Sequence, residues 1–256
     1  MAHKTAEFDQ MVERLMEEWH VPGLSIAVVQ GDHIDAKLIP SDFVLPTQSL
    51  TYQVTLEDIL SHRSGIPTHD ESYLGVTAAH PDDARSLTRN LRNLPFTAAL
   101  RTKMQYSNIM FSVATHVVES LSKEDYTSFL RSRIWEPLTM NNTFQDRPDV
   151  PSSAHEAQGY RWDEDASRYV PIPVLASPEG RGAWCVLTSA GDYAKFVRCL
   201  INRAAPLSAE SHKALVEPRS IEVGDLDGVL PGYADVSLYG LGAVPGYVSR
   251  EDAHDA

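Results

Sequence analysis

A strongly patterned helix near the middle of the chain constrains the fold more than any other feature. Such a helix is predicted because apolar residues recur three and four positions apart and so form one stripe. The stripe consists of Met110, Val113, Ala114, Val117, Val118 and Leu121. The chain has 256 residues and is 43% hydrophobic, so it can bury one sizeable core around that helix.

Further elements are predicted before this helix. Apolar positions within residues 8–19 predict an amphipathic helix, and residues 24–29 predict a buried strand. The next segment, "IDAKLIPSDFVLP", contains Pro40 and Pro46. Proline removes a hydrogen-bond donor from a strand, so this segment is predicted to be too short and too interrupted to be a full partner for the first strand.

Capping signals predict several later helices. Thr55 and Asp58 form a capping box ahead of "LEDILSHRSG", which predicts a short helix closed by Gly65. Another helix is predicted at 126–135, and a long loop with one short hairpin at 145–182. Ser189 and Ser208 are predicted to cap two more helices. The apolar side of the helix that Ser189 caps is predicted to consist of Tyr193, Phe196, Val197, Leu200 and Ile201.

Composition disfavours several classes of partner. The chain has 35 acidic and 22 basic residues, a formal charge of -13, which disfavours nucleic acid and anionic membranes as partners. Cys185 and Cys199 are too few for a disulfide framework and are predicted to be reduced core thiols. No apolar run is long enough for a signal or membrane helix, so a cytoplasmic protein is predicted. The oligomeric state is left open.

Two polar clusters could bind a ligand, but a simpler interpretation is favoured for each. His62, His69 and Asp70 share one loop, yet no histidine has the short spacing to a second ligand that is typical of zinc sites. Ordinary polar loop residues are therefore favoured there, and no metal or organic cofactor is predicted. The segment "DDARSLTRNLRNL" predicts a helix with arginines on one face, for which a solvated face is favoured over an anion site. These are Arg85, Arg89 and Arg92.

Several segments together resemble the serine β-lactamase-like family, which includes class C β-lactamases, penicillin-binding carboxypeptidases, esterases and transesterases. They are "VPGLSIAVV" (21–29), "LEDILSHRSGIP" (56–67), "YSN" (106–108), "IWEPLTMNNTF" (134–144), "TSAGDYAKFV" (188–197) and "YGLG" (239–242). The residues around "LIPSDFVLP" and "YSNIMF" resemble those of the fungal branch of this family.

The resemblance implies a fold class of α/β (α+β), with an antiparallel sheet flanked by helices and a helical subdomain, in incomplete form. It implies a single domain over residues 1–256, with a helical insertion at about 55–205 and truncation at the C-terminus.

The resemblance also assigns two site residues. It implies that Tyr106 is the general acid/base and that Asn108 is the amide that orients the substrate, in acyl transfer through an activated serine. A tyrosine titrates near ~10, so Tyr106 would need a neighbouring lysine to act as a base. On residue types alone, Tyr106 would be a helix-start anchor and Asn108 a helix-terminal polar residue. The flanking segments favour the catalytic interpretation.

The nucleophile motif of the family, Ser-x-x-Lys, is absent from the interval before "LEDILSHRSG". The one Ser-x-x-Lys in the chain begins at Ser120, fourteen residues after Tyr106, which is ~20 Å along a helix. No Lys-x-Gly or His-x-Gly triplet follows Gly242. Whole strands and a helix of the family are missing at these two gaps. Two hypotheses would explain them: coding segments were skipped, or the gene is a truncated pseudogene.

Two functional interpretations remain. The first is a β-lactamase-related serine hydrolase or acyltransferase of the esterase/transesterase type, acting on a small-molecule ester or amide in fungal secondary metabolism. In that case the chain as written is catalytically impaired. The alternative is a non-catalytic remnant that binds a metabolite or a protein partner. Whether the chain is an enzyme thus depends on the missing nucleophile.

The 256-residue chain is expected not to turn over a chromogenic ester or cephalosporin, because it lacks the nucleophile motif. Incubation with a serine-directed fluorophosphonate, followed by intact-mass measurement, tests this expectation. A stoichiometric covalent adduct would prove it wrong.

Overall fold

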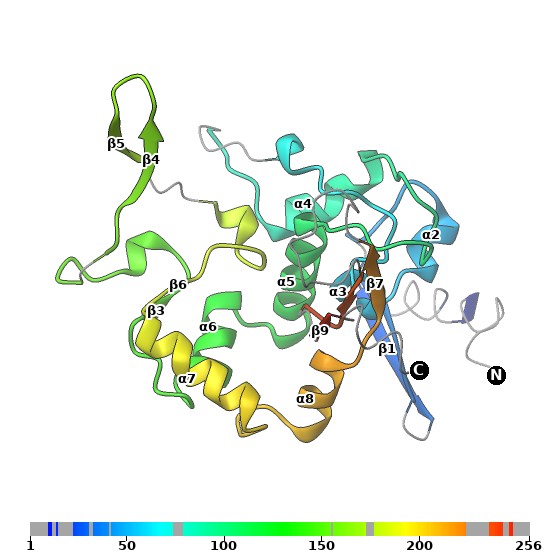
Figure 1. Cartoon of the computed structure of the whole chain (residues 1–256). Helices are drawn as coiled ribbons and strands as arrows, with labels where there is room; N and C mark the ends of the chain where they lie inside the picture. The colour runs from blue at the N-terminus through cyan, green and yellow to red at the C-terminus, as the bar shows by residue number, and fades with distance from the viewer. Residues whose placement is uncertain are drawn as a thin grey trace, which may run out of the picture.

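The fold of the chain was obtained as a computed structural model, drawn in Figure 1. It describes residues 10–11, 14, 23–30, 33–40, 42–73, 79–154, 156–172, 177–223, 236–242 and 246–247. Most of the predicted helix at 8–19 lies outside these residues. In the described part of the chain, no helix is both long enough and apolar enough to cross a membrane.

The first described sheet is an antiparallel hairpin. Strand β1 (Gly23–Gln30) pairs with β2 (His33–Pro40) along its full length, from Gly23 opposite Pro40 to Gln30 opposite His33. The strand predicted at 24–29 is therefore confirmed. The prediction that no full partner follows is wrong, because Pro40 is the last residue of β2 and Pro46 lies beyond the strand. Neither proline removes a donor from the interior of the ladder.

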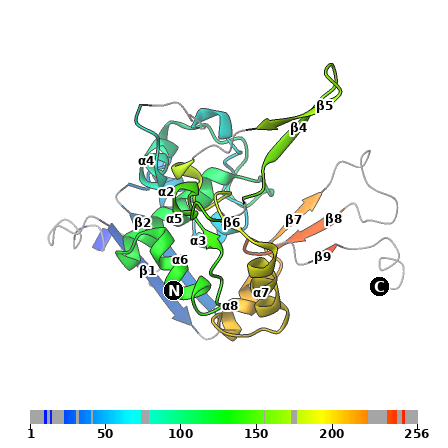
Figure 2. The same cartoon turned by 90° about the vertical axis from the view of Figure 1, so that its left-hand side faces the viewer.

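Helix α5 (Asn108–Ser122) lies at the centre of the described helices, beside α3 (Leu56–Leu60) and α4 (Ala84–Asn90), as Figures 1 and 2 show. The predicted apolar stripe is buried at Met110, Val113 and Val117, whereas Leu121 in the last turn is exposed. The central helix predicted from the sequence is thus confirmed, with its stripe buried towards α3 and α4.

One cluster of buried side chains forms the core around α3, α4 and α5. Each large aliphatic side chain that it buries contributes about 1.5–3 kcal/mol to stability. The cluster consists of Phe43, Leu45, Val54, Ile59, Ile66, Tyr73, Leu87, Leu91, Leu94, Ile109, Met110, Val113 and Val117.

The remaining described helices are short, apart from one near residue 195. They are α2 (Gln48–Gln53), η2 (Asp70–Ser72), η3 (Leu91–Asn93), α6 (Tyr126–Leu130), the π-helix η4 (Arg131–Trp135), η5 (Arg147–Asp149), η6 (Pro178–Gly180), α7 (Ala190–Ile201) and α8 (Ala209–Val216). The helix predicted at 126–135 is confirmed as α6 followed by η4.

The other described strands form small antiparallel sheets. β3 (Thr143–Phe144) pairs with β6 (Leu187–Thr188), β4 (Gly159–Asp163) with β5 (Arg168–Ile172), and β7 (Ser220–Val223) with β8 (Val236–Tyr239) and β9 (Gly246–Tyr247). The β4–β5 hairpin, predicted within 145–182, projects away from the helices (Figures 1 and 2). The predicted mixture of helices and antiparallel sheet is confirmed. The single domain with an insertion at 55–205 stays a prediction.

Helix α7 departs from its predicted packing. Its cap is as predicted, because Ser189 Oγ accepts a hydrogen bond from the Asp192 amide at 3.2 Å. Its apolar side is not buried as a whole, however, since Tyr193 is 56% exposed and Ile201 is 74% exposed. Both cysteines are free, with Cys199 buried in α7 and Cys185 half-buried. Ser208 caps α8 as predicted, accepting from the Ser211 amide at 3.1 Å.

The arginines of α4 are held by a carboxylate on the protein itself. Arg85 Nε lies 2.9 Å from Asp42 Oδ2, and Arg89 Nε lies 3.6 Å from Asp42 Oδ1. Arg92 Nε donates to the Arg89 carbonyl at 2.7 Å. Arg85 and Arg89 remain largely exposed, as the predicted solvated face requires.

Helix α3 begins at a buried carboxylate. Asp58 is fully buried and closes the predicted capping box, accepting from the Thr55 amide at 3.0 Å and the Thr55 hydroxyl at 2.8 Å. Arg101 makes a bidentate pair with the same carboxylate, at 2.9 and 2.8 Å. The helix ends at Leu60, with Ser61 as its C-cap, so the prediction that Gly65 closes it is wrong.

Gly65 instead shapes the loop after α3. Its φ of +87° is in the left-handed region, and a Cβ atom there would lie 2.4 Å from the Ala98 carbonyl oxygen. The Gly65 carbonyl accepts hydrogen bonds from the amides of Thr97 and Ala98. The position needs glycine for both its conformation and its close backbone contact.

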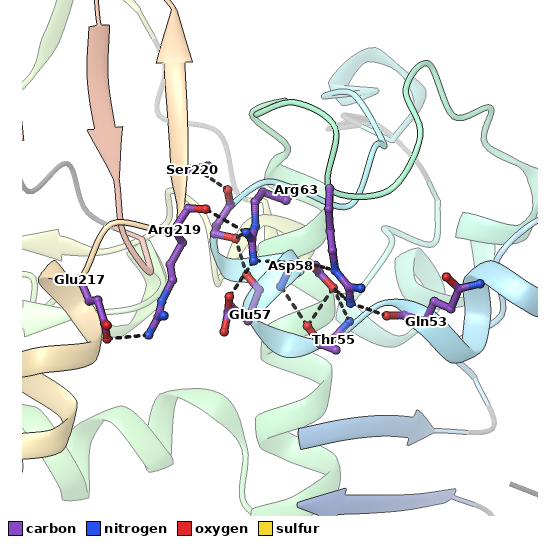
Figure 3. Close-up of polar contacts among 10 residues, drawn as sticks. Gln53, Thr55, Glu57, Asp58, Arg63, Glu217, Arg219 and Ser220 are labelled. Carbon is purple, nitrogen blue, oxygen red and sulfur yellow. Dashed lines mark hydrogen bonds and ion pairs between the residues drawn. The ribbon is translucent and has the colours of Figure 1, made fainter. Parts of the chain in front are cut away.

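A second arginine connects α3 to the strand β7, which follows much later in the chain (Figure 3). Arg63 Nη2 donates to Glu57 at 2.6 Å, and Arg63 Nη1 donates to the Arg219 carbonyl at 2.9 Å. Ser220 Oγ donates to the Ser61 carbonyl at 2.9 Å. These bonds hold the start of β7 against the end of α3.

Replacing Asp58 is expected to destabilise the fold strongly. The change Asp58→Asn removes the charge that holds Arg101 and the cap, so the free energy of unfolding should fall by about 2–3 kcal/mol. Urea unfolding followed by circular dichroism measures the loss. Glu57→Gln on the same helix is the control, and its exposed pair with Arg63 should contribute less than about 1 kcal/mol. Equal losses in the two variants would contradict this account.

Candidate active site

Tyr106 and Asn108 lie on one side of an extended residue. Ser107 has φ −150° and ψ 106°, so side chains at the positions before and after it point to the same side. Ser107 is fully buried, whereas Tyr106 is 50% exposed. The Tyr-x-Asn spacing therefore presents the two predicted site residues together on an accessible face, where α5 begins.

His62 holds this segment in place. The Ser107 amide donates to His62 Nδ1 at 3.1 Å, and the Gln105 amide donates to the His62 carbonyl at 2.8 Å. The Ser107 hydroxyl in turn donates to the Pro67 carbonyl at 3.1 Å. The loop after α3 thus positions the start of α5.

The contacts of His62 define its tautomer. A backbone N–H can only donate, so Nδ1 must be the acceptor and the proton must lie on Nε2. Nε2 then donates to the Tyr239 hydroxyl, 3.1 Å away. The ring centroids of Tyr106 and Phe111 lie 4.5 and 5.1 Å from that of His62. Burial among these groups lowers the pKa of His62 to about 4.

The loop residues His62, His69 and Asp70, for which a metal site is disfavoured by the sequence, each contact another group of the protein. His62 bonds to Ser107 and Tyr239, and His69 Nε2 lies 2.8 Å from the Pro95 carbonyl oxygen. Asp70 accepts from Asn108 Nδ2 at 2.9 Å. Each of the three residues therefore has its own partner within the protein.

Asp70 is part of a longer chain of contacts. The Tyr73 hydroxyl donates to Asp70 Oδ1 at 2.7 Å, and the Tyr73 ring stacks on Trp184 with centroids 6.3 Å apart. Burial, and then the hydrogen bond to Asp70, raise the pKa of the Tyr73 hydroxyl well above its ordinary value. Tyr73 therefore remains a protonated donor.

A loop near residue 180 packs against the side of α5. The Ser112 hydroxyl donates to the Glu179 carbonyl at 2.7 Å, and a Cβ atom on Gly182 would lie 2.1 Å from Thr115 Oγ1. Glu179 is buried, and desolvation raises the pKa of its carboxyl group. The loop thus contributes a carboxyl group with reduced acidity to this region.

The structure does not join the Ser-x-x-Lys of this chain to the site. Ser120 lies in the last turn of α5 and Lys123 is its C-cap, whereas Tyr106 precedes the first turn. Twelve residues of helix between Asn108 and Ser120 span about 18 Å. In the part of the chain that the structure describes, no lysine makes a hydrogen bond to Tyr106. Lys195, for example, binds the Asp192 carboxylate at 2.7 Å.

The family resemblance predicts Tyr106 and Asn108 as site residues, and residue spacing does not predict the side chains that contact this segment. Asp70, Tyr73 and Tyr239 act through contacts between distant parts of the chain, which residue spacing does not reveal. The one available signal was the position of His62 and Tyr239 within "LEDILSHRSGIP" and "YGLG", two of the segments that carry the family resemblance.

The stability of the protein is expected to depend on pH through His62. Its pKa is about 4 when folded and about 6.5 when unfolded, so the unfolded chain binds more protons between these values. The stabilisation is therefore complete above pH 6.5 and is lost as the pH falls towards 4. It amounts to about 3 kcal/mol.

Urea unfolding at pH 7, 6 and 5 tests this prediction. His62→Gln should be less stable than the unsubstituted protein at pH 7, and the difference should shrink at pH 5. His80→Gln, at an exposed position, is the control and should keep the original pH dependence. If His62→Gln shows the same dependence as the unsubstituted protein, His62 is not the titrating group.

Comparison with known proteins identifies the family. The family model described as Beta-lactamase matches residues 34–244. The curated protein "Unguisins hydrolase ungD'" of Aspergillus campestris (strain IBT 28561) is 30% identical over 270 residues, covering 84% of this chain and 51% of that protein. The chain thus spans about half the length of this relative.

Solved structures show the same fold. The octameric penicillin-binding protein homologue from Pyrococcus abyssi matches with a TM-score of 0.59 and 19% identity, over 94% of this chain and 65% of that chain. The D-amino acid amidase from Ochrobactrum anthropi SV3 matches with a TM-score of 0.57 and 21% identity, over 78% and 56%. Because the family model matches residues 34–244, well over half of the chain, this chain belongs to the beta-lactamase family.

Proposed function

We propose that this protein is a β-lactamase-related serine hydrolase or acyltransferase, of the esterase/transesterase type, that acts on a small-molecule ester or amide. In this proposal Tyr106 is the general acid/base and Asn108 orients the substrate. The 256-residue chain is catalytically impaired, because it lacks the serine and lysine that would start the reaction.

The shared face of Tyr106 and Asn108 carries this proposal. Both side chains project from one side of an extended segment, and Tyr106 is half-exposed while the residue between them is buried. A group that exchanges protons with a substrate must be accessible, and it must be held at a fixed distance from the group that binds the substrate. The fixed backbone around Ser107 meets both needs.

The chemistry would proceed in two steps. Tyr106, as a phenolate, takes the proton of a serine hydroxyl while the serine oxygen attacks the acyl carbon; the bond to the alcohol or amine leaving group then breaks, and Tyr106 passes that proton to the leaving group. Water or another acceptor next gives a proton to Tyr106 and attacks the acyl-serine ester, and the serine oxygen leaves with that proton. Tyr106 acts as a base at neutral pH only beside a cation, and the described residues do not supply a lysine for that role.

The names of the relatives support hydrolysis of small molecules. One is called an unguisins hydrolase and another a D-amino acid amidase, and the first is a fungal protein. From these names we infer that this protein acts in fungal secondary metabolism and that its substrate is an ester or amide.

A second candidate is a non-catalytic remnant that binds a metabolite or a protein partner through the same face. The specific observation in its favour is that the only Ser-x-x-Lys begins at Ser120, at the far end of α5 from Tyr106. The remnant would bind an acyl compound without turning it over.

If the two gaps are skipped coding segments, turnover by the product with those segments restored separates the two candidates. Hydrolysis of p-nitrophenyl acetate is expected for that product. Tyr106→Phe should lower kcat by about 10²- to 10⁴-fold, because it removes the group that transfers the proton. Tyr169→Phe, at a 70% exposed position on the β4–β5 hairpin, is the matched control and should change kcat less than twofold.

Each contrary result has a distinct meaning. Full activity in Tyr106→Phe would remove Tyr106 from the mechanism while leaving the hydrolase in place. Saturable binding of acyl compounds by the product with those segments restored, without turnover, would favour the remnant.

A further inference from the structure

The hairpin of β4 and β5 is an arm that the rest of the described structure does not support. It projects away from the helices (Figures 1 and 2). Among the described residues, no hydrogen bond or ion pair joins residues 159–172 to a helix. The bonds that they make stay within the hairpin, such as that from Gln158 Nε2 to the Ile172 carbonyl at 2.7 Å. A two-stranded hairpin alone is marginally stable in water, so a partner that extends this sheet would stabilise it.

One face of the hairpin is aromatic and exposed. Residues directly opposite each other in a strand pair share a face. Tyr160 lies opposite Pro171, and Trp162, two residues further along the same face, lies opposite Tyr169. The exposed fractions of Tyr160, Trp162 and Tyr169 are 56, 46 and 70%. The rings of Trp162 and Tyr169 meet edge-on, with centroids 5.1 Å apart. Exposed apolar side chains gathered in this way indicate a contact surface.

A proline determines which edge of the hairpin can pair with another strand. Pro171 has no N–H, and proline occurs in sheets where its nitrogen faces away from the neighbouring strand. The outer edge of β5 therefore lacks a donor. Because Tyr160 lies opposite Pro171, its main-chain N–H and C=O also face outward, and so do those of Trp162. Strand β4 contains no proline, so its outer edge is the one that can add a strand.

The charges of β4 favour a second copy of β4 as the added strand. On the face opposite the aromatic rings, Arg161 Nη2 lies 3.8 Å from Asp163 Oδ2. When two copies of β4 pair antiparallel about Trp162, Arg161 of each copy lies opposite Asp163 of the other. Pairing about Arg161 or about Asp163 would place like charges opposite each other, which is destabilising. Pairing about Tyr160 would place Arg161 opposite Gly159. The edge therefore complements its own charges in the register centred on Trp162.

We propose that two copies of this protein associate through the outer edges of β4, antiparallel and centred on Trp162, to form one four-stranded sheet. A pair of main-chain hydrogen bonds then joins Trp162 of one copy to Trp162 of the other. Arg161 and Asp163 form reciprocal ion pairs on one face, and on the other face the aromatic side chains of the two copies shield one another from water. This inference is independent of the proposed function, since the hairpin does not include Tyr106 or Asn108.

Sedimentation velocity of the 256-residue chain in about 0.15 M salt tests for the dimer. The contact is small, and each copy carries a formal charge of -13, so the dimer is expected to be weak. Between about 5 and 500 μM protein, the weight-average mass should rise from 28.4 kDa towards twice that value. A mass of 28.4 kDa at every concentration overturns the proposal.

Charge exchange tests the pairing of Arg161 with Asp163. Arg161→Asp and Asp163→Arg each place like charges across the edge, so each should weaken association by about tenfold or more. The double variant Arg161→Asp/Asp163→Arg restores opposite charges at an unchanged net charge and should associate as the unsubstituted chain does. Lys103→Asp, at an exposed position outside the hairpin, is the control for the net charge of Arg161→Asp and should change association less than about twofold. Association that survives both single variants overturns the proposed edge.

A cross-link tests the centre of the register independently. Opposite residues in an antiparallel pair have Cβ atoms about 4.5–5.5 Å apart, which a disulfide can join after a small shift. Trp162→Cys should therefore form a disulfide-linked dimer under mild oxidation, above the background from Cys185 and Cys199 in the unsubstituted chain. Tyr160→Cys is the matched control, because its two copies would lie four residues apart along the strands, or about 13 Å, and should not cross-link. Equal yields at the two positions, or no cross-link at position 162, overturn the register.

Discussion

The neutral imidazole of His62 joins three parts of the chain that are far apart in sequence. Its Nδ1 accepts from the Ser107 amide and its Nε2 donates to the Tyr239 hydroxyl, both at 3.1 Å. A charged imidazolium could not accept from Ser107, so the arrangement depends on burial keeping the ring unprotonated. The segment that carries Tyr106 therefore owes its position to the neutral ring of His62.

The five-residue helix α3, which lies just before His62 in the chain, supports the same region. A helix this short is not stable alone, since the first turn costs more free energy than its hydrogen bonds return. The buried carboxylate of Asp58 compensates by capping α3 and pairing with Arg101. Arg63, just beyond α3, reaches the Arg219 carbonyl at the start of β7. Polar groups from distant segments thus converge on one short helix, which then supports His62.

The sequence predicts those features that depend on neighbours along the chain. The stripe of α5, the capping box of Thr55 and Asp58, and the caps at Ser189 and Ser208 are all local patterns, and all are present. The pairing of β2 is not predicted, because the sequence does not show that Pro40 stands at the end of the strand and not in its interior. The bond from Asn108 to Asp70 spans 38 residues, and that from His62 to Tyr239 spans 177, so neither has a spacing signal. Tyr106 and Asn108 are predicted as site residues only by the family resemblance.

Replacing Gly65 is expected to disturb contacts well beyond the glycine itself. A Cβ atom there would meet the Ala98 carbonyl oxygen at 2.4 Å, so any other residue must displace the backbone that leads to Arg101. Arg101 is the residue that neutralises Asp58, and the amide of Gln105, a little further along, binds the His62 carbonyl. A single missense mutation at Gly65 would therefore disturb both the Arg101–Asp58 ion pair and the backbone contact of Gln105 with His62, neither of which the glycine touches.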